Sequence, residues 1–432
     1  RVFGLTDASV RALGALAGAL TVVPLYALGR SLFDRPTGAL AALLLAVNPY
    51  HVWYSQEVRM HALAVLSTAL SLYAFWRLLR GGRLPWWLAH LFFTTLTFYM
   101  QSYVVFLVVA ENLFVLGYLW AAHGSPFSRA GWSWLRLWLL EQALTLVLML
   151  PGAYILQVKM LELRQWDWLS GAYGRPGLMQ VTSLLADWVL GFDFPGGRAL
   201  LWSVLLLVGA LAAWGVWQRW RTSAALERGR PGRSGTALAL VLTCLAVPLA
   251  LVFVLGQFTA LWVTRYLLPF LPLLLLLAAL GIRELPRALG WLPAVALVAV
   301  SAYALAAMVT TPQKEDWRGL AQRMTPQVTE ADVIVLMDDE CRVPFNHYFG
   351  RGGRRIGISR FANDMALDAA IASLGRLNRG GRLWLVVSHA DSAALETLLQ
   401  ALPWLSEPHE TALVGIRLIE FEMQPTGSSA AP

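Results

Sequence analysis

RALGALAGALTVVPLYALGRSLFDRPTGALAALLLAVNPYHVWYSQEVRMHAL, residues 11–63, decides the fold of this chain. Two apolar runs, roughly 10–29 and 37–49, are separated by a short segment that contains two arginines, and a polar stretch follows the second run. A helix needs about 20 predominantly apolar residues to cross a bilayer. The stretch therefore predicts helices that cross a membrane and turn at its two surfaces.

The rest of the chain repeats this pattern. Of its 432 residues, 57% are hydrophobic and 14% are charged, with a mean hydropathy of +0.56. Soluble domains have about 25% charged residues. Because helices satisfy their backbone polar groups internally in lipid, we expect an α-helical polytopic membrane bundle with about ten spans. The predicted spans are roughly 10–29, 37–49, 58–77, 86–100, 103–120, 136–156, 199–217, 237–256, 264–282 and 290–309.

Arginines in the loops predict the orientation. One set of alternate loops carries at least two arginines each: 30–36, 77–85, 121–136, 218–236 and 283–289. The short loops between them carry none: 50–57, 100–103 and 257–263. Cytoplasmic loops are enriched in Lys and Arg, so the first set is predicted to be cytoplasmic. The 157–198 loop and everything after Thr310 are then predicted to lie outside.

The composition divides the chain into a transmembrane domain, 1–310, and a smaller C-terminal part. The outer loop 157–198 has an amphipathic segment after Pro176, which predicts a helix in the membrane interface; the alternative is an ordinary connector. From 311 to 423, short apolar strands alternate with helical segments, which predicts an extracytoplasmic α/β domain. The last residues, 424–432, have the sequence QPTGSSAAP and predict a disordered tail.

Several other classes of function find no support. The net charge of +8 comes from loop arginines, with only two lysines, and does not indicate nucleic acid. Cys244 lies in an apolar run and Cys341 in the C-terminal part, so no disulfide is expected. Asp338 to Glu340 either bind a cation or cap a helix. No metal-ligand spacing or phosphate-binding loop is present, so no cofactor is expected and a divalent metal is unfavoured.

Polar residues gather where spans meet the predicted outer surface. Arg11 begins the first span, Arg265 begins another, and residues 54–61 include Ser55, Glu57 and Arg59. Ser55 can cap the helix that follows, with Glu57 in its first turn, or Glu57 can serve a site. Outward arginines oppose the charge bias of membrane proteins. They either contact headgroups separately or converge on one lipid phosphate.

Three stretches resemble the bacterial family 39 membrane glycosyltransferases, which are relatives of the dolichyl-phosphate-mannose protein mannosyltransferases and of the lipid A aminoarabinose transferase. The segment YSQEVRMHAL (54–63) is the most specific. RYLLPFLPLLLLLAALG (265–281) and EDWRGLAQ (315–322) are also similar. The resemblance covers essentially the whole chain and implies a GT-C membrane fold.

The resemblance also implies an activity. Such enzymes move a sugar from a polyprenyl-phosphate donor to an extracytoplasmic lipid, glycan or protein hydroxyl, in a bacterial plasma membrane. Membrane lipids, the donor and the acceptor are then the expected partners, and the outward arginines would hold the carrier phosphate. The expected substrate-binding residues are Arg11, Tyr54, Gln56, Glu57, Arg59, Trp168, Arg265 and Tyr266.

The sequence departs from the family at its start. The family's catalytic base is an acidic residue in the first outer loop, which would precede Arg1, so we expect the base upstream and assign none here. His61 stands where tyrosine is usual, and FYMQSY (98–103) replaces a tyrosine-threonine-histidine-tyrosine pattern. These differences leave the sugar and the acceptor undefined.

Two alternatives belong to other classes. A transporter or lipid flippase would have paired ionisable residues at mid-membrane and inverted repeats. A non-catalytic lipid-binding assembly protein would have a closed bundle without a carboxylate beside the arginines.

Overall fold

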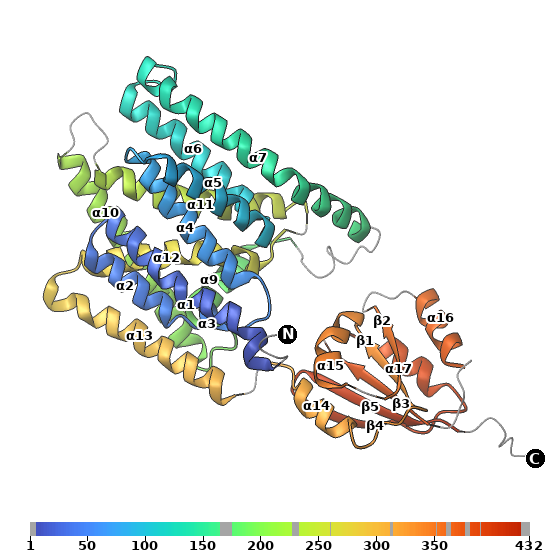
Figure 1. Ribbon diagram of the computed structural model, residues 1–432. Helices are drawn as coiled ribbons and strands as arrows, with labels where there is room; N and C mark the ends of the chain where they lie inside the picture. The colour runs from blue at the N-terminus through green and yellow to red at the C-terminus, as the bar shows by residue number, and fades with distance from the viewer. Residues whose placement is uncertain are drawn as a thin grey trace, which may run out of the picture. The chain divides into compact units, whose positions relative to one another are not determined.

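The protein divides into two compact units, residues 1–307 and 308–432, each with its own hydrophobic core (Figure 1). The computed structural model describes residues 6–164, 175–226, 233–259, 261–311, 314–350, 352–359, 364–375, 381–388 and 390–424. The predicted disordered tail therefore lies outside the described residues, apart from Gln424.

The first unit is helical throughout its described ranges. Its elements are α1 (Asp7–Leu32), α2 (Arg35–Ala46), α3 (Pro49–Ser55), α4 (His61–Leu79), α5 (Leu84–Met100), α6 (Val104–His123), α7 (Arg129–Arg164), α9 (Leu178–Leu190), α10 (Gly197–Leu226), α11 (Arg233–Gly256), the 3-10 helix η1 (Thr264–Phe270), α12 (Leu271–Arg283) and α13 (Arg287–Thr310). The α-helical bundle predicted from the sequence is confirmed, and every predicted span falls on a helix.

Eight helical segments of the described chain are long and apolar enough to cross a membrane. The other two predicted spans are shorter helices. The helix α5 has 17 residues. The helix α2 has 12, because the Asp34 side chain caps its start and Asn48-Pro49 begins a new helix after it. By length and composition, eight segments are therefore candidate spans, and the crossing of the membrane by α2 and α5 stays a prediction.

The bundle is built around the segment formed by η1 and α12. In this segment, Thr264–Arg283, 83% of the most apolar window is buried inside the protein, against 17% for Ala288–Thr310 in α13. The helices α10 and α2 pack against α12, while α4 and α11 contact η1. Because η1 begins at Thr264, the central segment presents Arg265 and Tyr266 at one end of the bundle.

The predicted outer loop, 157–198, is largely helical where the structure describes it. The helix α7 extends to Arg164, and α9 forms the helix that the sequence predicts after Pro176. One side of α9 is buried through Leu184 and the run Trp188 to Leu190, which pack into the bundle core. Its placement in a membrane interface stays a prediction.

The second unit has a five-stranded mixed sheet in the order β2-β1-β3-β5-β4. Its strands are β1 (Val333–Met337), β2 (Arg354–Ile358), β3 (Arg382–Val387), β4 (His409–Leu413) and β5 (Ile416–Glu422). Its helices are α14 (Trp317–Met324), η2 (Asp339–Cys341), α15 (Arg342–Tyr348), α16 (Asp364–Gly375) and α17 (Ala393–Gln400). The strands β2, β1 and β3 are parallel, and β5 runs antiparallel to β3 and β4.

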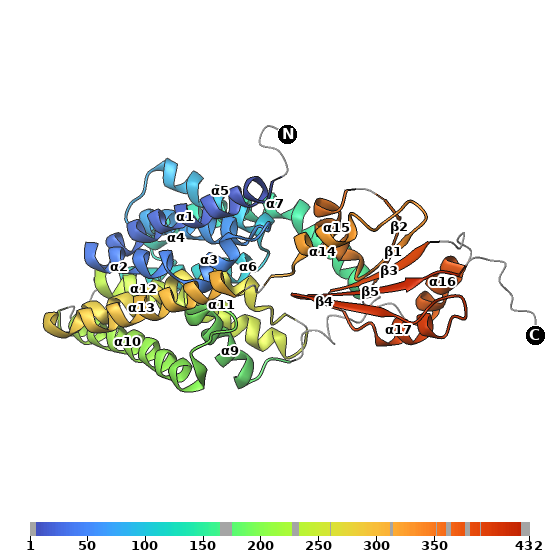
Figure 2. The same ribbon diagram turned by 90° about the horizontal axis from the view of Figure 1, so that it is seen from below.

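Alternation along β1 and β3 gives this sheet two buried faces (Figure 2). Val333, Val335 and Met337 pack with α16 and α17, whereas Ile334 and Leu336 pack with α14 and α15. Successive strand side chains point to opposite faces, so helices on both sides bury the whole strand. The α/β fold predicted for this part of the chain is confirmed.

Asp332, just before β1, connects three segments of the second unit. Its carboxylate accepts hydrogen bonds from Thr329 N (2.9 Å), Arg382 N (2.7 Å) and Trp384 Nε1 (3.2 Å), and the residue is 3% exposed. We predict that Asp332→Ala lowers the free energy of unfolding of this unit by about 3 kcal/mol, because buried donors lose their acceptor. Hydrogen exchange of the β1 and β3 amides in the full-length protein measures this. Glu407→Ala, at an exposed position, is the control; equal protection in both variants would contradict the prediction.

Candidate functional site

The turn between α2 and α4, which the sequence predicts at the outer surface, contains a short helix, α3, whose start is fixed by Asn48. Asn48 is its N-cap and accepts a hydrogen bond from His51 N at 2.8 Å, while Pro49 occupies the first helical turn. The Asn48 amide also donates to Trp188 O in α9, at 2.7 Å. One side chain therefore starts α3 and attaches it to a helix far along the sequence.

The end of α3 differs from the sequence expectation. Ser55 does not cap the following helix: it is the last residue of α3, and its hydroxyl donates to His51 O at 2.7 Å. The helix α4 begins only at His61 and has no side-chain cap. Glu57 consequently lies in the turn between the helices, where it accepts a hydrogen bond from Trp53 Nε1 at 3.1 Å. Its expected place in a first helical turn is wrong.

The helix α1 approaches this turn very closely. A Cβ added at Gly14 would lie 3.0 Å from the carbonyl oxygens of Ser55 and Glu57, and one at Gly18 would lie 2.1 Å from Ser55 Oγ. His51 Nε2 donates to Gly18 O at 3.2 Å. Residues three and seven apart share a helix face, so Arg11 lies one turn from Gly14 on the side of α1 that meets the turn.

Aromatic rings from separate elements meet behind the turn. The Tyr54 ring lies 5.0 Å from the His61 ring, which lies 6.1 Å from the Tyr266 ring at the start of η1. Tyr103, before α6, lies 5.2 Å from Tyr266. Phe192, after α9, contacts Tyr54 with a ring separation of 6.0 Å. The sequence candidates Tyr54 and Tyr266 therefore share one aromatic cluster through His61.

Two of the three expected phosphate-binding arginines are brought to this cluster. The charges of Arg59 and Arg265 both act on the His61 ring. The Arg265 guanidinium lies 5.3 Å from the centre of the Tyr266 ring, and Arg59 is exposed. His61 is thus influenced by two arginines that lie about 200 residues apart in the sequence.

The remaining candidates have different outcomes. Gln56 is the C-cap of α3 and half-buried, but the described contacts give it no binding role. Trp168 lies outside the described residues. Arg11 is placed only by the packing of α1, so its convergence with Arg59 and Arg265 on one group stays a prediction.

A carboxylate that the sequence analysis did not single out belongs to the same region. Asp187, in α9, is close enough to Tyr50 and Tyr54 for its charge to act on both. Burial, together with the charge of Asp193, raises the pKa of Asp187 to about 7. Burial likewise raises the pKa of Tyr54 to about 12. The sequence offered one indication of a role for Asp187, which is its position beside Trp188 on an amphipathic helix. The residues that surround it in space lie elsewhere in the chain and could not be inferred from the neighbouring sequence.

The acidic run Asp338 to Glu340 is occupied by local contacts. The Asp338 carboxylate accepts a hydrogen bond from Glu340 N at 3.3 Å, and Asp339 pairs with Arg342 at 2.9 Å. Within the described ranges, no group of three His, Cys, Asp or Glu side chains is arranged to hold a metal ion. The expectation that no cofactor is needed stays a prediction.

The raised pKa of Asp187 predicts a specific pH dependence of stability. The unfolded value is close to 3.8, so between about pH 4 and 7 the folded protein holds a proton that the unfolded chain releases. Stability should therefore fall as the pH rises through this window, and Asp187→Asn should remove that fall and raise the Tm near pH 8. Thermal unfolding across the window tests this, with Asp391→Asn as an exposed control; the same slope in wild type and Asp187→Asn would refute it.

Residues 1–155 match the family described as "Dolichyl-phosphate-mannose-protein mannosyltransferase". No curated protein sequence matches the chain.

Solved structures match over nearly the full length. ArnT from Cupriavidus metallidurans bound to undecaprenyl phosphate is 14% identical over 100% of this chain and 86% of that chain, with a TM-score of 0.56. Its apo structure is 12% identical over 95% and 83%, with the same TM-score of 0.56. The Archaeoglobus fulgidus oligosaccharyltransferase in complex with Zn and sulfate is 14% identical over 97% of this chain and 61% of that chain, with a TM-score of 0.53. These identities show the fold alone. The chain is therefore a multi-pass membrane protein with the GT-C glycosyltransferase fold, and its first 155 residues match the dolichyl-phosphate-mannose-protein mannosyltransferase family.

Proposed function

We propose that the protein is a glycosyltransferase that moves a sugar from a polyprenyl-phosphate carrier to an acceptor hydroxyl outside the cytoplasm. The observation that supports this most directly is that the charges of Arg59 and Arg265, from separate segments, both act on the His61 ring. The fold likeness to a protein bound to undecaprenyl phosphate adds to it.

The chemistry of the step requires cations at this position. The acceptor oxygen bonds to the anomeric carbon while the bond from that carbon to the phosphate oxygen breaks, and the carrier phosphate leaves with an additional negative charge. Arginines can form paired, charge-assisted hydrogen bonds with such a phosphate. Arg265 is half-buried, so less water screens it than the exposed Arg59. Arg11, on the same side of α1, is the third proposed ligand.

The acceptor must lose a proton during transfer. Two described carboxylates, Glu57 and Asp187, act electrostatically on Tyr54. Asp187 has a pKa of about 7, which suits a group that exchanges protons near neutral pH. Glu57 is tied to Trp53 and is better suited to shape the site. Asp187 is therefore proposed as a group that orients the acceptor hydroxyl or accepts its proton.

The proposed orientation places this site at the outer surface of a bacterial plasma membrane. It rests on the arginine-rich loops, such as the α4–α5 loop around Arg80 and the α10–α11 loop, being cytoplasmic. The site then opens to the side where lipid-linked sugars are used, and the α/β unit lies outside as well.

A transporter is the second candidate, because one observation favours it. Paired ionisable residues do occur at mid-membrane, since His90, Glu111 and Glu141 contact one another inside the bundle. All three are nearly or fully inaccessible, however, and they contact one another, so they do not line an open pathway.

The phosphate assignment predicts a large loss of activity from single arginine changes. In transfer assays with the full-length protein and a radiolabelled polyprenyl-phosphate sugar, Arg59→Ala and Arg265→Ala should each lower the rate by roughly 100-fold, as expected when one group that stabilises developing charge is removed. Arg265→Lys should recover part of the rate, because it restores charge without the planar fork.

The control for these variants is Arg221→Ala, whose guanidinium lies 4.5 Å from the centre of the Trp217 ring in the C-terminal part of α10. It should transfer at the wild-type rate. If Arg59→Ala and Arg265→Ala are also as active as wild type while eluting as monodisperse protein, the arginines do not hold the leaving phosphate and the proposal fails.

Asp187 and Glu57 should differ in their effect on the pH profile. Asp187→Asn should lower the transfer rate and remove an inflection of the rate near pH 7, because the titrating group is lost. Glu57→Gln should lower the rate without moving the inflection. Rates measured from about pH 5 to 9 decide between them; an unchanged inflection in Asp187→Asn would exclude Asp187 from the proton-transfer step.

A further inference from the structure

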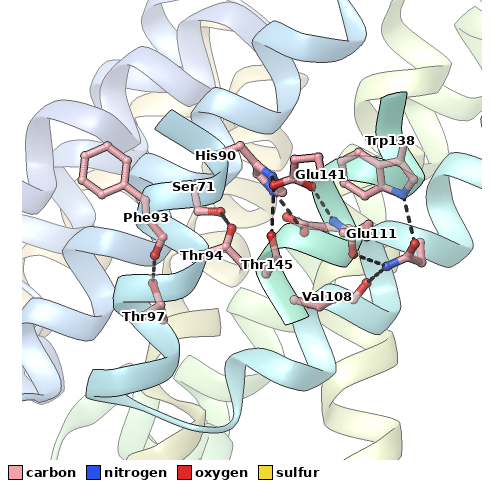
Figure 3. Close-up of polar contacts among 12 residues, drawn as sticks. Ser71, His90, Phe93, Thr94, Thr97, Val108, Glu111, Trp138, Glu141 and Thr145 are labelled. Atoms are coloured by element: carbon pink, nitrogen blue, oxygen red, sulfur yellow. Dashed lines mark hydrogen bonds and ion pairs between the residues drawn. The ribbon is translucent and has the colours of Figure 1, made fainter. Parts of the chain in front are cut away.

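Three ionisable side chains meet in the interior of the helical bundle, away from the outer site (Figure 3). His90 comes from α5, Glu111 from α6 and Glu141 from α7. Their side chains are 0%, 0% and 5% exposed. Each lies at least six residues inside its helix, so all three are at membrane depth, where charged groups are costly and usually serve a role.

The imidazole of His90 bridges the two carboxylates. Nδ1 lies 2.9 Å from Glu141 Oε1, and Nε2 lies 3.2 Å from Glu111 Oε2. A neutral imidazole has one donor and one acceptor nitrogen, whereas an imidazolium donates from both. Because both ring nitrogens face carboxyl oxygens, only an imidazolium donates a hydrogen bond to each carboxyl group.

The two carboxyl groups have unequal surroundings. Glu141 also accepts hydrogen bonds from Gln142 Nε2 at 2.7 Å and from Thr145 Oγ1 at 3.2 Å. Among the described residues, Glu111 Oε1 has no hydrogen-bond partner although it is fully buried. A carboxylate that accepts three hydrogen bonds is stabilised as the anion, whereas a carboxylate with one bare oxygen is not. The negative charge therefore belongs on Glu141.

A neighbouring shell holds Glu141 and its amide donor in place. Gln142 accepts a hydrogen bond from Asn112 Nδ2 at 2.7 Å, and Asn112 accepts one from Trp138 Nε1 at 2.9 Å. Cys244, a buried thiol in α11, is the other described titratable group close enough to Glu111 for their charges to interact. Among the described residues, no arginine or lysine forms an ion pair with the three groups, so their charges must balance among themselves.

Charge balance and the anion at Glu141 together select one protonation state. A neutral imidazole with two carboxylates carries a net charge of −2, so two added protons give zero on any two of the three groups. Because Glu141 accepts three hydrogen bonds and stays ionised, the protons lie on His90 and Glu111, which gives an imidazolium, a carboxylate at Glu141 and a carboxylic acid at Glu111. A protonation state with a net charge costs more free energy in a low-dielectric interior than the neutral state does.

We propose that His90, Glu111 and Glu141 form a proton-binding site within the membrane. In this site the Glu111 carboxyl group holds a proton beside the imidazolium of His90. The neutral set joins α5, α6 and α7 by hydrogen bonds that can form in only one register.

Infrared spectroscopy of the full-length protein in nanodiscs tests the position of the proton. At about pH 8, where Asp187 is mostly ionised, wild type should show the hydrogen–deuterium-sensitive C=O stretching band of a buried carboxylic acid. Glu111→Gln should lose this band, and the control Glu284→Gln, which removes an ion-paired carboxylate, should keep it. A band that survives Glu111→Gln, or no band in wild type, would overturn the proposal.

Nitrogen NMR of the histidine side chains tests the imidazolium. With His90 assigned as the signal missing in His90→Gln, both of its ring nitrogens should be protonated at neutral pH. One protonated and one bare nitrogen would show a neutral ring and overturn the assignment. The infrared band and the protonation of the ring nitrogens are both measured on the wild-type protein, and His90→Gln serves only to assign the His90 signal.

Stability supplies the matched comparison. Glu111→Gln mimics the neutral acid, so its Tm should stay within about 2 °C of wild type. Glu141→Gln leaves the imidazolium without its anion and should lower the Tm by roughly 10 °C, as expected for breaking a buried ion pair. Thr145→Val, which removes one donor to Glu141, should fall between them. Equal losses in Glu111→Gln and Glu141→Gln, or a larger loss in Glu111→Gln, would refute the proposed proton position.

Discussion

The hydrogen bonds of Asn48 determine how the outer end of the bundle is arranged. The side chain caps α3 through His51 N and donates to Trp188 O, so the same amide both starts a short helix and holds α9 against it. With α3 fixed in this way, the Tyr54 ring contacts the His61 ring, and Glu57 and Arg59 lie in the turn between α3 and α4. Without this cap, the backbone after α2 would have an unsatisfied donor and no reason to break where it does.

The cost of charge in a low-dielectric medium explains the two polar groups of the bundle. At the outer turn, cations are tolerated because water or a phosphate can reach them, and Arg59 is exposed. In the interior no solvent is available, so His90 is placed between two carboxylates and its neighbours complete their hydrogen bonds. The same physical penalty therefore accounts for an exposed cation at one depth and a buried, mutually hydrogen-bonded group at another.

Much of the fold could be predicted from local pattern. The apolar runs predicted every long helix, and strand-length segments such as DVIVLM predicted the sheet, because hydrophobic periodicity depends on neighbouring residues alone. The helix α2 is shorter than an ordinary span, since the Asp34 side chain caps its start and Asn48 begins α3 directly after it. Ser55 was misplaced because its hydroxyl can satisfy His51 O as readily as cap a helix, and the sequence does not say which.

The site was only partly predictable for a related reason. Arg59 and Arg265 stood out because outward arginines oppose the charge bias of membrane proteins, and that signal requires no knowledge of the fold. Asp187 and the partners of His90 gave no such signal, since a single carboxylate within an apolar helix acquires meaning only from residues on other helices. Contacts across 20 to 50 residues or more are a property of packing and not of spacing along the chain.

The bond between Asn48 and Trp188 also has a consequence for biosynthesis. The two residues are 140 positions apart, so the ribosome must add that many residues before the bond can form. At rates of about 5–20 residues per second, the outer turn waits roughly ten seconds after its own synthesis before α9 becomes available. During that interval four further helices, α4 to α7, are synthesised, and the turn after α3 stays without its partner helix. In a nascent chain the bond therefore forms after α4 to α7 are made and before η1, which supplies Arg265 and Tyr266.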